Sequence, residues 1–315
     1  MPEQSRRSFL RSGLIAGAAL GGRVRRSAAE DAKKQASADM SIMRWKRPPE
    51  PDGEAIDHMA ERLTEEALTA LGGMPRFVNK GDVVWLKPNI GFERTPEFGA
   101  ITNPNVVAAL VRLCYDAGAG KVRVGDHSCY DAGRAYEMSG IPKAAAAQGA
   151  EVVHLKPARF KMMALGGQRI KQWLVSQDIH EADLVINIPV AKLHAMTAIT
   201  VCFKNYMGVI GGPRHEWHTD MPTCLNDITA FMKPRLSVVD AVRTLVKHAP
   251  IGYSPEHALL RGVVAAGTDV VALEAFGAEL LGLDPNQGKT MNEAQQRGLG
   301  RIDYRKLRLT EREIA

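Results

Sequence analysis

Residues 185–208 combine an apolar run with basic and amide side chains. The segment reads VINIPVAKLHAMTAITVCFKNYMG and contains Lys192, His194, Lys204 and Asn205 but no Asp or Glu. Amines and imidazoles without local carboxylates are typical of sites that bind phosphate or carboxylate groups. Lysines brought together in a partly dry cleft repel each other, so at least one should have a lowered pKa and could act as a base or nucleophile.

The segment MGVIGGPRHEWH, which begins at Met207, adds further residue types of this kind. Its glycines, beginning with Gly208, could turn backbone N–H groups toward an anion, and Arg214 offers a planar fork suited to carboxylate or phosphate. His215 and His218 could share a helical face and bind a divalent metal or transfer protons. The spacing is not that of the HExxH zinc motif, and two incidental histidines in an exposed loop would look the same.

Polar residues also follow or end five expected strands. In open parallel sheets ligands bind beyond the carboxyl ends of the strands, so these side chains are expected to meet at one edge. In chain order, the residues at the ends of the five strands are Lys87 and Asn89, then Asp126 with His127 and Ser128, then Lys192 and His194, then Asp240, and finally Asp269. Polar residues also stop strands for structural reasons, so the prediction depends on the coincidence across all five.

The residues after the central strand can be interpreted in two ways. A helix over 194–205 would place Thr200 and Lys204 on one polar stripe, extended by His194 and Asn205, with apolar residues opposite. Such a stripe could equally face solvent, although it carries no acidic residue. Alternatively TAITVCF is a strand, because it is rich in β-branched residues, and the stripe then does not exist.

Two acidic residues, Asp269 and Glu274, lie in or next to the predicted helix over 269–283, and structural roles could explain both. Asp269 is expected to cap the helix that follows it, because Asp accepts a hydrogen bond from a free backbone N–H at that position. Glu274 lies in an otherwise apolar helix. We expect it either to pair with a cation at the sheet edge or to mark the exposed side of the helix.

Short Val- and Ile-rich runs alternate with helical patterns along the chain. This predicts an α/β fold, with a mostly parallel sheet covered by helices on both faces, in a single domain over 39–315. Strands are expected at 82–89, 121–126, 151–155, 183–190, 235–241 and 261–267, and helices at 54–71, from Asn103-Pro104 to Gly118 or Gly120, at 135–149 with a break, and at 269–283. The alternating stretch 156–182 suggests an inserted hairpin.

The charge is concentrated at the N-terminus. The net charge is +6, but residues 1–38 hold eight Lys and Arg against three acidic residues, which leaves 33 basic and 32 acidic residues beyond them. The body of the protein is therefore almost neutral. A basic surface for nucleic acid is not indicated.

The N-terminal segment has the layout of a secretory signal. SRRSFLR, which contains Arg6 and Arg7, precedes the uncharged run SGLIAGAALGG, which is too short for a mature membrane-spanning helix. The paired arginines resemble the twin-arginine type, which predicts a periplasmic protein exported by the twin-arginine machinery. Cleavage could follow Ala29 or Ala38. A disordered basic tail and an uncleaved anchor are the alternatives.

The four cysteines do not form a recognisable metal or cluster motif. None of them belongs to a C-x-x-C pair, so the sequence contains no motif for an intrinsic iron–sulfur cluster or a zinc knuckle. Cys114 and Cys202 have apolar neighbours and are expected in the core. In an oxidising compartment one disulfide could form, and whether Cys129 and Cys224 meet is left open.

Three segments together resemble a known family. LKPNI…TNPNVVAALVRLCYDAGAGKVRVGDHS, INIPVAKLHAMTAITVCFKNYMGVI…R and SVVDAV…GTDVVALEAFGAELLG are similar to domain-of-unknown-function family 362 over about 82–283. The most specific part holds Lys192, His194, Thr200, Lys204, Asn205 and Gly208. The resemblance implies an α/β fold and redox or cofactor-linked surroundings, because members are often exported or joined to ferredoxin-type modules. This chain has no such cysteine cluster, so an iron–sulfur role would need a separate partner protein.

Two functional hypotheses follow. In the first, the sheet edge binds an anionic small molecule or cofactor through Lys87, Lys192, Lys204 and Arg214. His194 or His215 would transfer protons, or His215 and His218 would share a divalent metal with a carboxylate. In the second, the same edge holds a cofactor or metal, without turnover, for a periplasmic redox partner.

Overall fold

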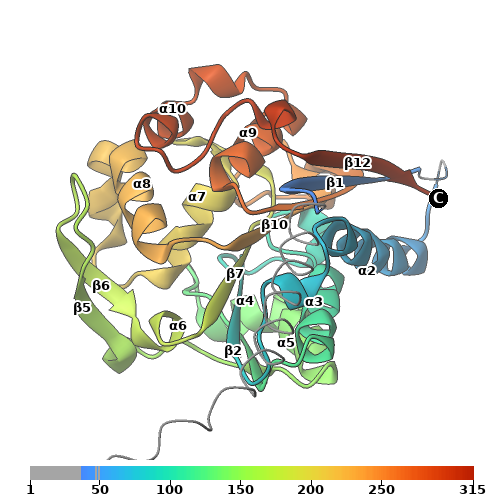
Figure 1. Ribbon diagram of the computed structural model, residues 1–315, viewed down its shortest axis with the longest axis horizontal. Coiled ribbons are helices and arrows are strands. Elements are labelled where there is room, and N and C mark those ends of the chain that lie inside the picture. The colour runs from blue at the N-terminus through green and yellow to red at the C-terminus, as the bar shows by residue number, and fades with distance from the viewer. Residues whose placement is uncertain (1–36, 47, 49) are drawn as a thin grey trace, which may run out of the picture. The chain divides into compact units, whose positions relative to one another are not determined.

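The computed structural model describes residues 37–46, 48 and 50–315, and Ala38–Ala315 form one compact unit (Figure 1). The predicted leader lies outside the described residues, except for its last two positions. Among the residues that are described, no helix is both long and apolar enough to cross a membrane.

A single large sheet organises this unit. Its eight strands follow the order β12-β1-β11-β10-β7-β2-β3-β4, and every neighbouring pair is parallel except the two pairs made by β11. The strands span β1 Met40–Trp45, β2 Val83–Pro88, β3 Lys121–Val124, β4 Glu151–Val152, β7 Leu184–Ile188, β10 Leu236–Leu245, β11 Ala258–Gly267 and β12 Leu309–Ile314. The predicted mostly parallel sheet is confirmed.

Helices cover both faces of the sheet, as predicted (Figure 1). Side chains alternate along each strand, so that Val84 and Leu86 of β2 join one buried layer while Trp85 joins the other. The first layer packs against α2 Gly53–Ala70, α3 Pro104–Asp116, α4 Ala132–Ser139 and α5 Ile141–Ala147. The second packs against α6 Gln177–His180, α7 Cys202–Asn205, α8 Met221–Met232, α9 Val270–Leu280 and α10 Lys289–Gln296. Cys114 and Cys202 are buried in these layers.

Local sequence signals explain several helix ends. Asp52 accepts a hydrogen bond from Ala55 N at the start of α2, and Asn103 accepts one from Asn105 N at the start of α3. Gly140 separates α4 from α5 in the left-handed conformation, with φ of 69°, which is the expected break. These signals explain why the helices fall where the sequence predicts them.

The remaining strands agree with the prediction to different degrees. The expected insertion is a hairpin of β5 Phe160–Ala164 and β6 Gln172–Ser176, so that prediction is confirmed. The strand expected over 151–155 is only the two-residue β4. The edge strand β12 and its neighbour β1 were not predicted, although they pair in parallel along their whole length.

The predicted helix over 194–205 is wrong for most of its length. Lys192–His194 and Ala198–Thr200 form a short antiparallel hairpin, β8 and β9, and only Cys202–Asn205 is helical. The alternative strand interpretation is correct for the first part of TAITVCF. Thr200 and Lys204 therefore do not share a helical stripe. Thr200 ends β9, and Lys204 lies on α7.

Candidate functional site

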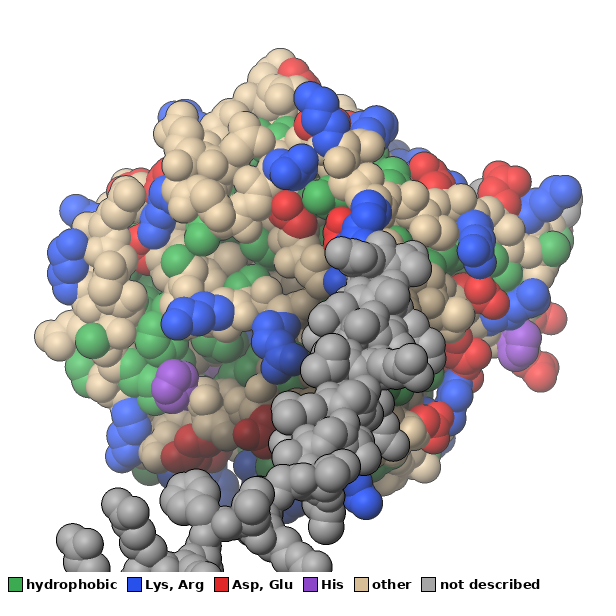
Figure 2. Space-filling model, in the orientation of Figure 1, with side chains coloured by type: hydrophobic (Ala, Val, Ile, Leu, Met, Phe, Trp, Pro, Cys, Tyr) green, Lys and Arg blue, Asp and Glu red, His purple; other side chains and the backbone are tan. Residues whose placement is uncertain are grey.

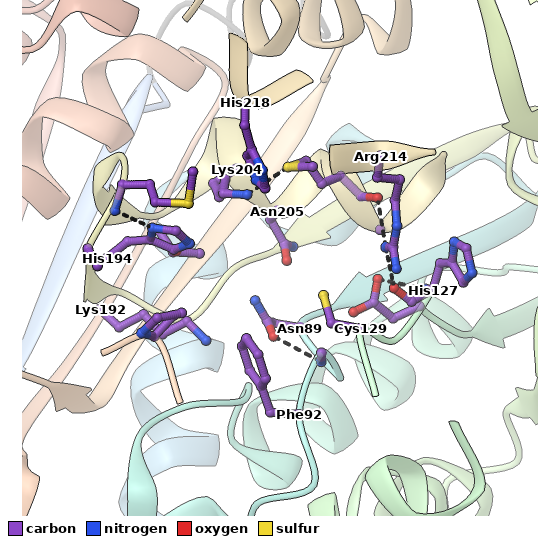
Figure 3. Close-up of a pocket in the computed structure, with 18 of the residues that line it drawn as sticks. Asn89, Phe92, His127, Cys129, Lys192, His194, Lys204, Asn205, Arg214 and His218 are labelled. Carbon is purple, nitrogen blue, oxygen red and sulfur yellow. Dashed lines mark hydrogen bonds between the residues drawn. The ribbon is translucent and has the colours of Figure 1, made fainter. Parts of the chain in front are cut away.

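A cavity of about 360 Å³ lies at the carboxyl edge of the parallel strands. Loops after β2, β3 and β7 line it together with the β8–β9 hairpin and the segment from α7 to the helix Arg214–Asp220 (Figure 3). The structure brings most of the predicted site residues to this cavity, namely Lys87, Asn89, Asp126, Lys192, His194, Thr200, Lys204, Asn205, Gly208, Arg214, His215 and His218.

Asp240 and Asp269 were predicted at the same edge. Asp240 lies level with the carboxyl end of β7, where it forms a parallel bridge with Val190, whereas the placement of Asp269 is wrong. Asp240 does not end a strand, because β10 continues to Leu245, and its buried carboxylate accepts hydrogen bonds from Asn103 N and Val242 N. Burial raises the pKa of Asp240 to about 6. Asp269 follows β11, which is antiparallel to its neighbours, so its carboxyl end lies at the opposite edge. Neither residue lines the cavity.

The structural roles of the two acids near α9 are clear. Asp269 accepts hydrogen bonds from the backbone N–H groups of Val271 and Ala272, so the capping prediction is confirmed. Glu274 is neither an exposed edge nor a partner of a cation in the cavity. Its side chain is buried, its Oε2 accepts a hydrogen bond from Phe203 N at 3.1 Å, and burial raises its pKa to about 7.

Lys87 and Asp126 form a buried ion pair at the floor of the cavity. Lys87 Nζ lies 2.6 Å from Asp126 Oδ1 and also donates to Pro88 O and Asn205 Oδ1. The two side chains are 1% and 4% exposed. Burial lowers the pKa of Lys87, and the carboxylate of Asp126 opposes that shift. Since three protein acceptors occupy Lys87, it holds the floor in shape, contrary to the expectation of a free anion-binding amine.

Gly208 is a glycine because this ion pair leaves no room for a side chain. A Cβ atom there would overlap the carboxylate of Asp126 and lie 2.6 Å from Lys87 Nζ. The Gly208 carbonyl also accepts a hydrogen bond from His127 N at 3.0 Å. The close approach of backbone and ion pair therefore accounts for this glycine, without the anion nest suggested by the sequence.

An amide relay connects the ion pair to the neighbouring strand. Asn205 accepts from Lys87 Nζ and donates through Nδ2 to Asn187 Oδ1 at 2.8 Å, while Asn187 Nδ2 donates to Cys202 O. Asn187 lies inside β7 and is fully buried. The sequence analysis missed it, although an Asn inside an apolar strand was a visible signal. The relay fixes α7 against the sheet and thereby positions Lys204.

Lys192 is a buried amine in contact with an aromatic ring. Its side chain is 1% exposed, its Nζ donates to Ala100 O, and it lies 4.5 Å from the centroid of the Phe92 ring. Burial, together with the nearby charge of Lys204, lowers its pKa to about 7. At neutral pH Lys192 is therefore present both as an ammonium and as a free amine.

Lys204 has a weaker set of partners. Its half-buried Nζ donates to the thioether Sδ of Met207 at 2.7 Å, and no carboxylate or carbonyl within the described part of the chain accepts from it. Burial, with the nearby charge of Arg214, lowers its pKa to about 8. Thr200 lines the same cavity, and its buried Oγ1 has no hydrogen-bond partner. An amine with only a thioether partner and an unpaired hydroxyl both indicate a ligand that supplies acceptors.

His194 presents a neutral donor to the cavity. Its Nδ1 accepts from Met196 N at 3.1 Å, so the ring proton resides on Nε2. Burial lowers the pKa of His194 to about 4, and the charges of Lys204 and Lys192 add to this effect. His194 therefore remains uncharged at neutral pH and can donate one hydrogen bond from Nε2.

Arg214 is committed mainly to backbone carbonyls. It donates from Nη1 to His127 O at 2.9 Å and to Met207 O at 3.3 Å, and from Nη2 to Ser128 O at 2.9 Å. The fork that the sequence offered to a carboxylate or phosphate thus joins two loops of the site. His127 stands beside it with Nδ1 bonded to Ile210 O at 2.7 Å, which leaves Nε2 as an acceptor. Burial lowers the pKa of His127.

His215 and His218 lie on the short helix Arg214–Asp220 and both line the cavity. This helix is of the 3₁₀ type, with about three residues per turn, so residues three apart share a face. Burial and the charge of Lys204 lower the pKa of His218. Within the part of the chain that the structure describes, no three His, Cys, Asp or Glu residues are grouped so that they could hold a metal ion.

Sequence reasoning missed Phe92 and Cys129, which also line the cavity. His127 was predicted at a strand end but was given no role in the site. Figure 3 shows His194 and Lys192 on one side, Arg214 and His127 on the other, and Cys129 between them. Cys129 is an exposed free thiol. The other three cysteines are also free, so Cys129 and Cys224 form no disulfide. Cys129 lies three residues after Asp126, so proximity to a strand end was the signal that could have found it.

Comparisons with known proteins identify a family, a relative and a solved structure with partial similarity. The model of a family described as Domain of unknown function (DUF362) matches residues 84–279. A thylakoid-associated protein of Synechocystis sp. is 31% identical over 241 residues, which cover 74% of this chain and 73% of that relative. A crystal structure of a protein from Thermotoga maritima gives a TM-score of 0.43 at 12% identity, over 73% of this chain and only 58% of the Thermotoga chain. The chain therefore belongs to the DUF362 family.

Proposed function

We propose that the cavity binds an anionic small molecule through Lys204. The observation that carries this proposal is the combination of an amine whose acceptor is a thioether with the unpaired Thr200 hydroxyl in one cavity. A phosphate or carboxylate oxygen would satisfy both groups, and the neutral His194 would add a donor from Nε2.

The charge balance of the cavity supports an anion. Among the described residues that line it, Asp126 is the one carboxylate, and Lys87 neutralises it at 2.6 Å. Arg214 and the titrating amines Lys192 and Lys204 then leave an excess of positive charge in a partly dry space. Since such a space screens charge weakly, the excess attracts an anion more strongly than exposed lysines would.

Lys192 is the residue that we propose for proton transfer or nucleophilic attack, should the bound anion react. An amine with a pKa of about 7 is deprotonated in a large fraction of molecules at neutral pH. The free amine can accept a proton or attack a carbonyl carbon, which an amine of ordinary pKa does poorly. His194 is less suited to this role, because its low pKa makes it a weak base.

The proposed location is outside the cytoplasm, reached by the twin-arginine route. The leader with Arg6 and Arg7 supports this, and the relative from Synechocystis sp. is described as thylakoid-associated. Ala38 is 6% exposed and its N–H donates to Ala70 O, so a peptidase would reach the bond after Ala38 poorly in a folded protein. We therefore favour cleavage after Ala29, and intact-mass measurement of exported protein tests it.

The second hypothesis, in which the protein holds a cofactor or metal for a redox partner without turnover, stays a prediction with a separate test. It requires a divalent metal at His215 and His218 and a periplasmic redox partner that carries the iron–sulfur cluster. Elemental analysis and native mass spectrometry of protein purified with its leader intact would detect a metal or a retained cofactor. A protein that purifies without either would remove this hypothesis and leave anion binding to be tested on its own.

Calorimetric titration with sulfate, phosphate, pyrophosphate and citrate tests the proposal. We expect Lys204→Ala to weaken binding roughly 10- to 100-fold, the size of one charge-assisted hydrogen bond, with a melting temperature within a few degrees of wild type. Lys143→Ala is the matched control, because Lys143 is an exposed helical lysine away from the cavity. Equal affinities of wild type and Lys204→Ala, or a large loss of stability in Lys204→Ala, would contradict it.

A further inference from the structure

A second cavity adjoins the first across Lys204. It has a volume of about 490 Å³, and both Lys204 and Met196 line the two cavities. The β8–β9 hairpin forms the partition, with Met196 at its tip, 60% exposed. The space-filling view shows a hollow over α7 with hydrophobic side chains on its walls and Lys or Arg side chains at its edge (Figure 2).

The walls of the two cavities differ in chemistry. The second is lined largely by aliphatic and thioether side chains from β9, α8, α9, α10 and the loop after α9, among them Ile199, Leu225, Ala278, Leu283 and Met291. Glu274 also lines it, but burial raises its pKa to about 7, so near neutral pH it carries a full charge in only part of the molecules. Asp284 and Lys289 line it as well, but both side chains are exposed to solvent. The interior of the second cavity therefore suits a hydrocarbon group, while the first cavity suits an anion.

We propose that the two cavities form one bipartite site for an amphiphilic anion, with a phosphate-type head group at Lys204 and a hydrocarbon tail in the second cavity. This inference rests on the proposed anion-binding function and names the class of ligand. The volumes of 360 and 490 Å³ together fall within the range of about 300–1,000 Å³ that is common for small-molecule sites. Lys204, at the boundary, contacts the head group, and the tail passes Met196.

The backbone at the partition supports a ligand that passes along it. Ala198, which lines the second cavity, has a φ of 62°, a left-handed conformation that is costly for a residue with a Cβ atom. Thr200 lines the first cavity, while Ala198 and Ile199, the two residues before it in β9, line the second. The strand β9 thus contributes to both the polar and the apolar part of one site.

Calorimetry with a series of alkyl phosphates tests the inference. Each fully buried methylene group contributes about 0.8 kcal/mol, or roughly fourfold in affinity. We therefore expect octyl phosphate to bind at least tenfold more tightly than methyl phosphate. Octyl glucoside, which has the same tail and no charge, should bind far more weakly than octyl phosphate.

Two variants test whether the hydrocarbon tail binds in the second cavity. Leu283→Lys puts a charge at its exposed rim, and Leu259→Lys is the matched control, because the two leucines are 38% and 43% exposed and Leu259 lies on β11. We expect Leu283→Lys to lose the gain from the longer tail while methyl phosphate binding is unchanged. Leu259→Lys should behave as wild type for every alkyl phosphate.

The possible failures are distinguishable. Binding of methyl and octyl phosphate with equal affinity would overturn the bipartite site and leave the anion site intact. Equal binding of octyl glucoside and octyl phosphate would overturn both, as would octyl phosphate binding that is unaffected by Lys204→Ala. Flotation with phosphatidylglycerol vesicles identifies the source of the ligand. Flotation that depends on Lys204 assigns a bilayer lipid, and no flotation assigns a free amphiphile.

Discussion

Replacing Gly208 by alanine is the sharpest test of how the site is built. The new methyl group would overlap the carboxylate of Asp126 and lie 2.6 Å from Lys87 Nζ. Neither side chain can move away without giving up several partners, because Asp126 also accepts hydrogen bonds from Ile90 N and His127 N. The ion pair at 2.6 Å must therefore break or the backbone at residue 208 must shift.

The size of the effect follows from the burial of the pair. Lys87 and Asp126 are 1% and 4% exposed, and breaking a buried ion pair while leaving its charges in place costs about 3–5 kcal/mol. For a domain of this size each kcal/mol lowers the melting temperature by about 2–4 °C. Gly208→Ala should therefore lower the melting temperature by roughly 6–20 °C.

Thermal unfolding followed by circular dichroism measures this directly. Gly53→Ala is the matched control, because Gly53 begins α2 and a Cβ atom there would meet nothing within 4 Å. It should leave the melting temperature unchanged or raise it slightly, since alanine favours helices. A melting temperature of Gly208→Ala within about 2 °C of wild type would refute the reasoning.

Three further predictions concern titration and export. The ¹³Cε resonance of Lys192, identified by its absence in Lys192→Met, should titrate with a midpoint near pH 7, and a midpoint near the ordinary lysine value of 10.5 would contradict its burial. Because the folded state raises the pKa of Glu274 from 4.5 to about 7, it binds more protons than the unfolded state in that window and stability falls as pH rises through it. Glu274→Gln should therefore gain up to about 3 kcal/mol over wild type at pH 8 and little at pH 5 in urea unfolding, whereas the same difference at both pH values would argue against it. Changing Arg6 and Arg7 to lysine should retain the protein in the cytoplasm, as measured by cell fractionation, and unchanged export would exclude the twin-arginine assignment.

The fold was largely predictable because its signals are local and repeated. Val- and Ile-rich strands alternate with helices that begin at capping residues such as Asp52 and Asn103, and the structure places them close to the predicted bounds. The edge strand β12 and its neighbour β1 were not predictable in this way. They pair with each other at opposite ends of the chain, and β12 has the mixed sequence LTEREI, which is typical of an exposed edge.

The site was predictable only as far as strand direction could be inferred. Residues after the parallel strands β2, β3 and β7 do meet, because parallel strands share one carboxyl edge. Asp269 fails because β11 runs the other way, and nothing in RGVVAAG reveals its direction. The partners of Lys87 and Arg214 were also hidden, since pairing between distant segments depends on tertiary packing.

The helix predicted over 194–205 failed for a different reason. The periodicity of such a short segment fits both a helix and a hairpin, and the β-branched residues Thr200 and Val201 favour the extended form. The left-handed turn at Ala198 completes the hairpin, and alanine gives no sequence signal for that conformation. The residues that face the cavity were identified, but the element that positions them was not.

Proton uptake on anion binding tests the central claim most directly. A bound anion stabilises the charged forms of Lys192 and Lys204, whose pKa values of about 7 and about 8 leave both partly deprotonated at pH 8. Sulfate, which does not titrate in this range, should therefore bind with an uptake of between about half a proton and about one and a half protons per anion at pH 8, where the cavity histidines with lowered pKa values contribute little. Calorimetry in buffers of different ionisation enthalpy measures this number. Sulfate binding at pH 8 without proton uptake, or with an uptake unchanged in Lys204→Ala, would contradict an anion site built on these amines.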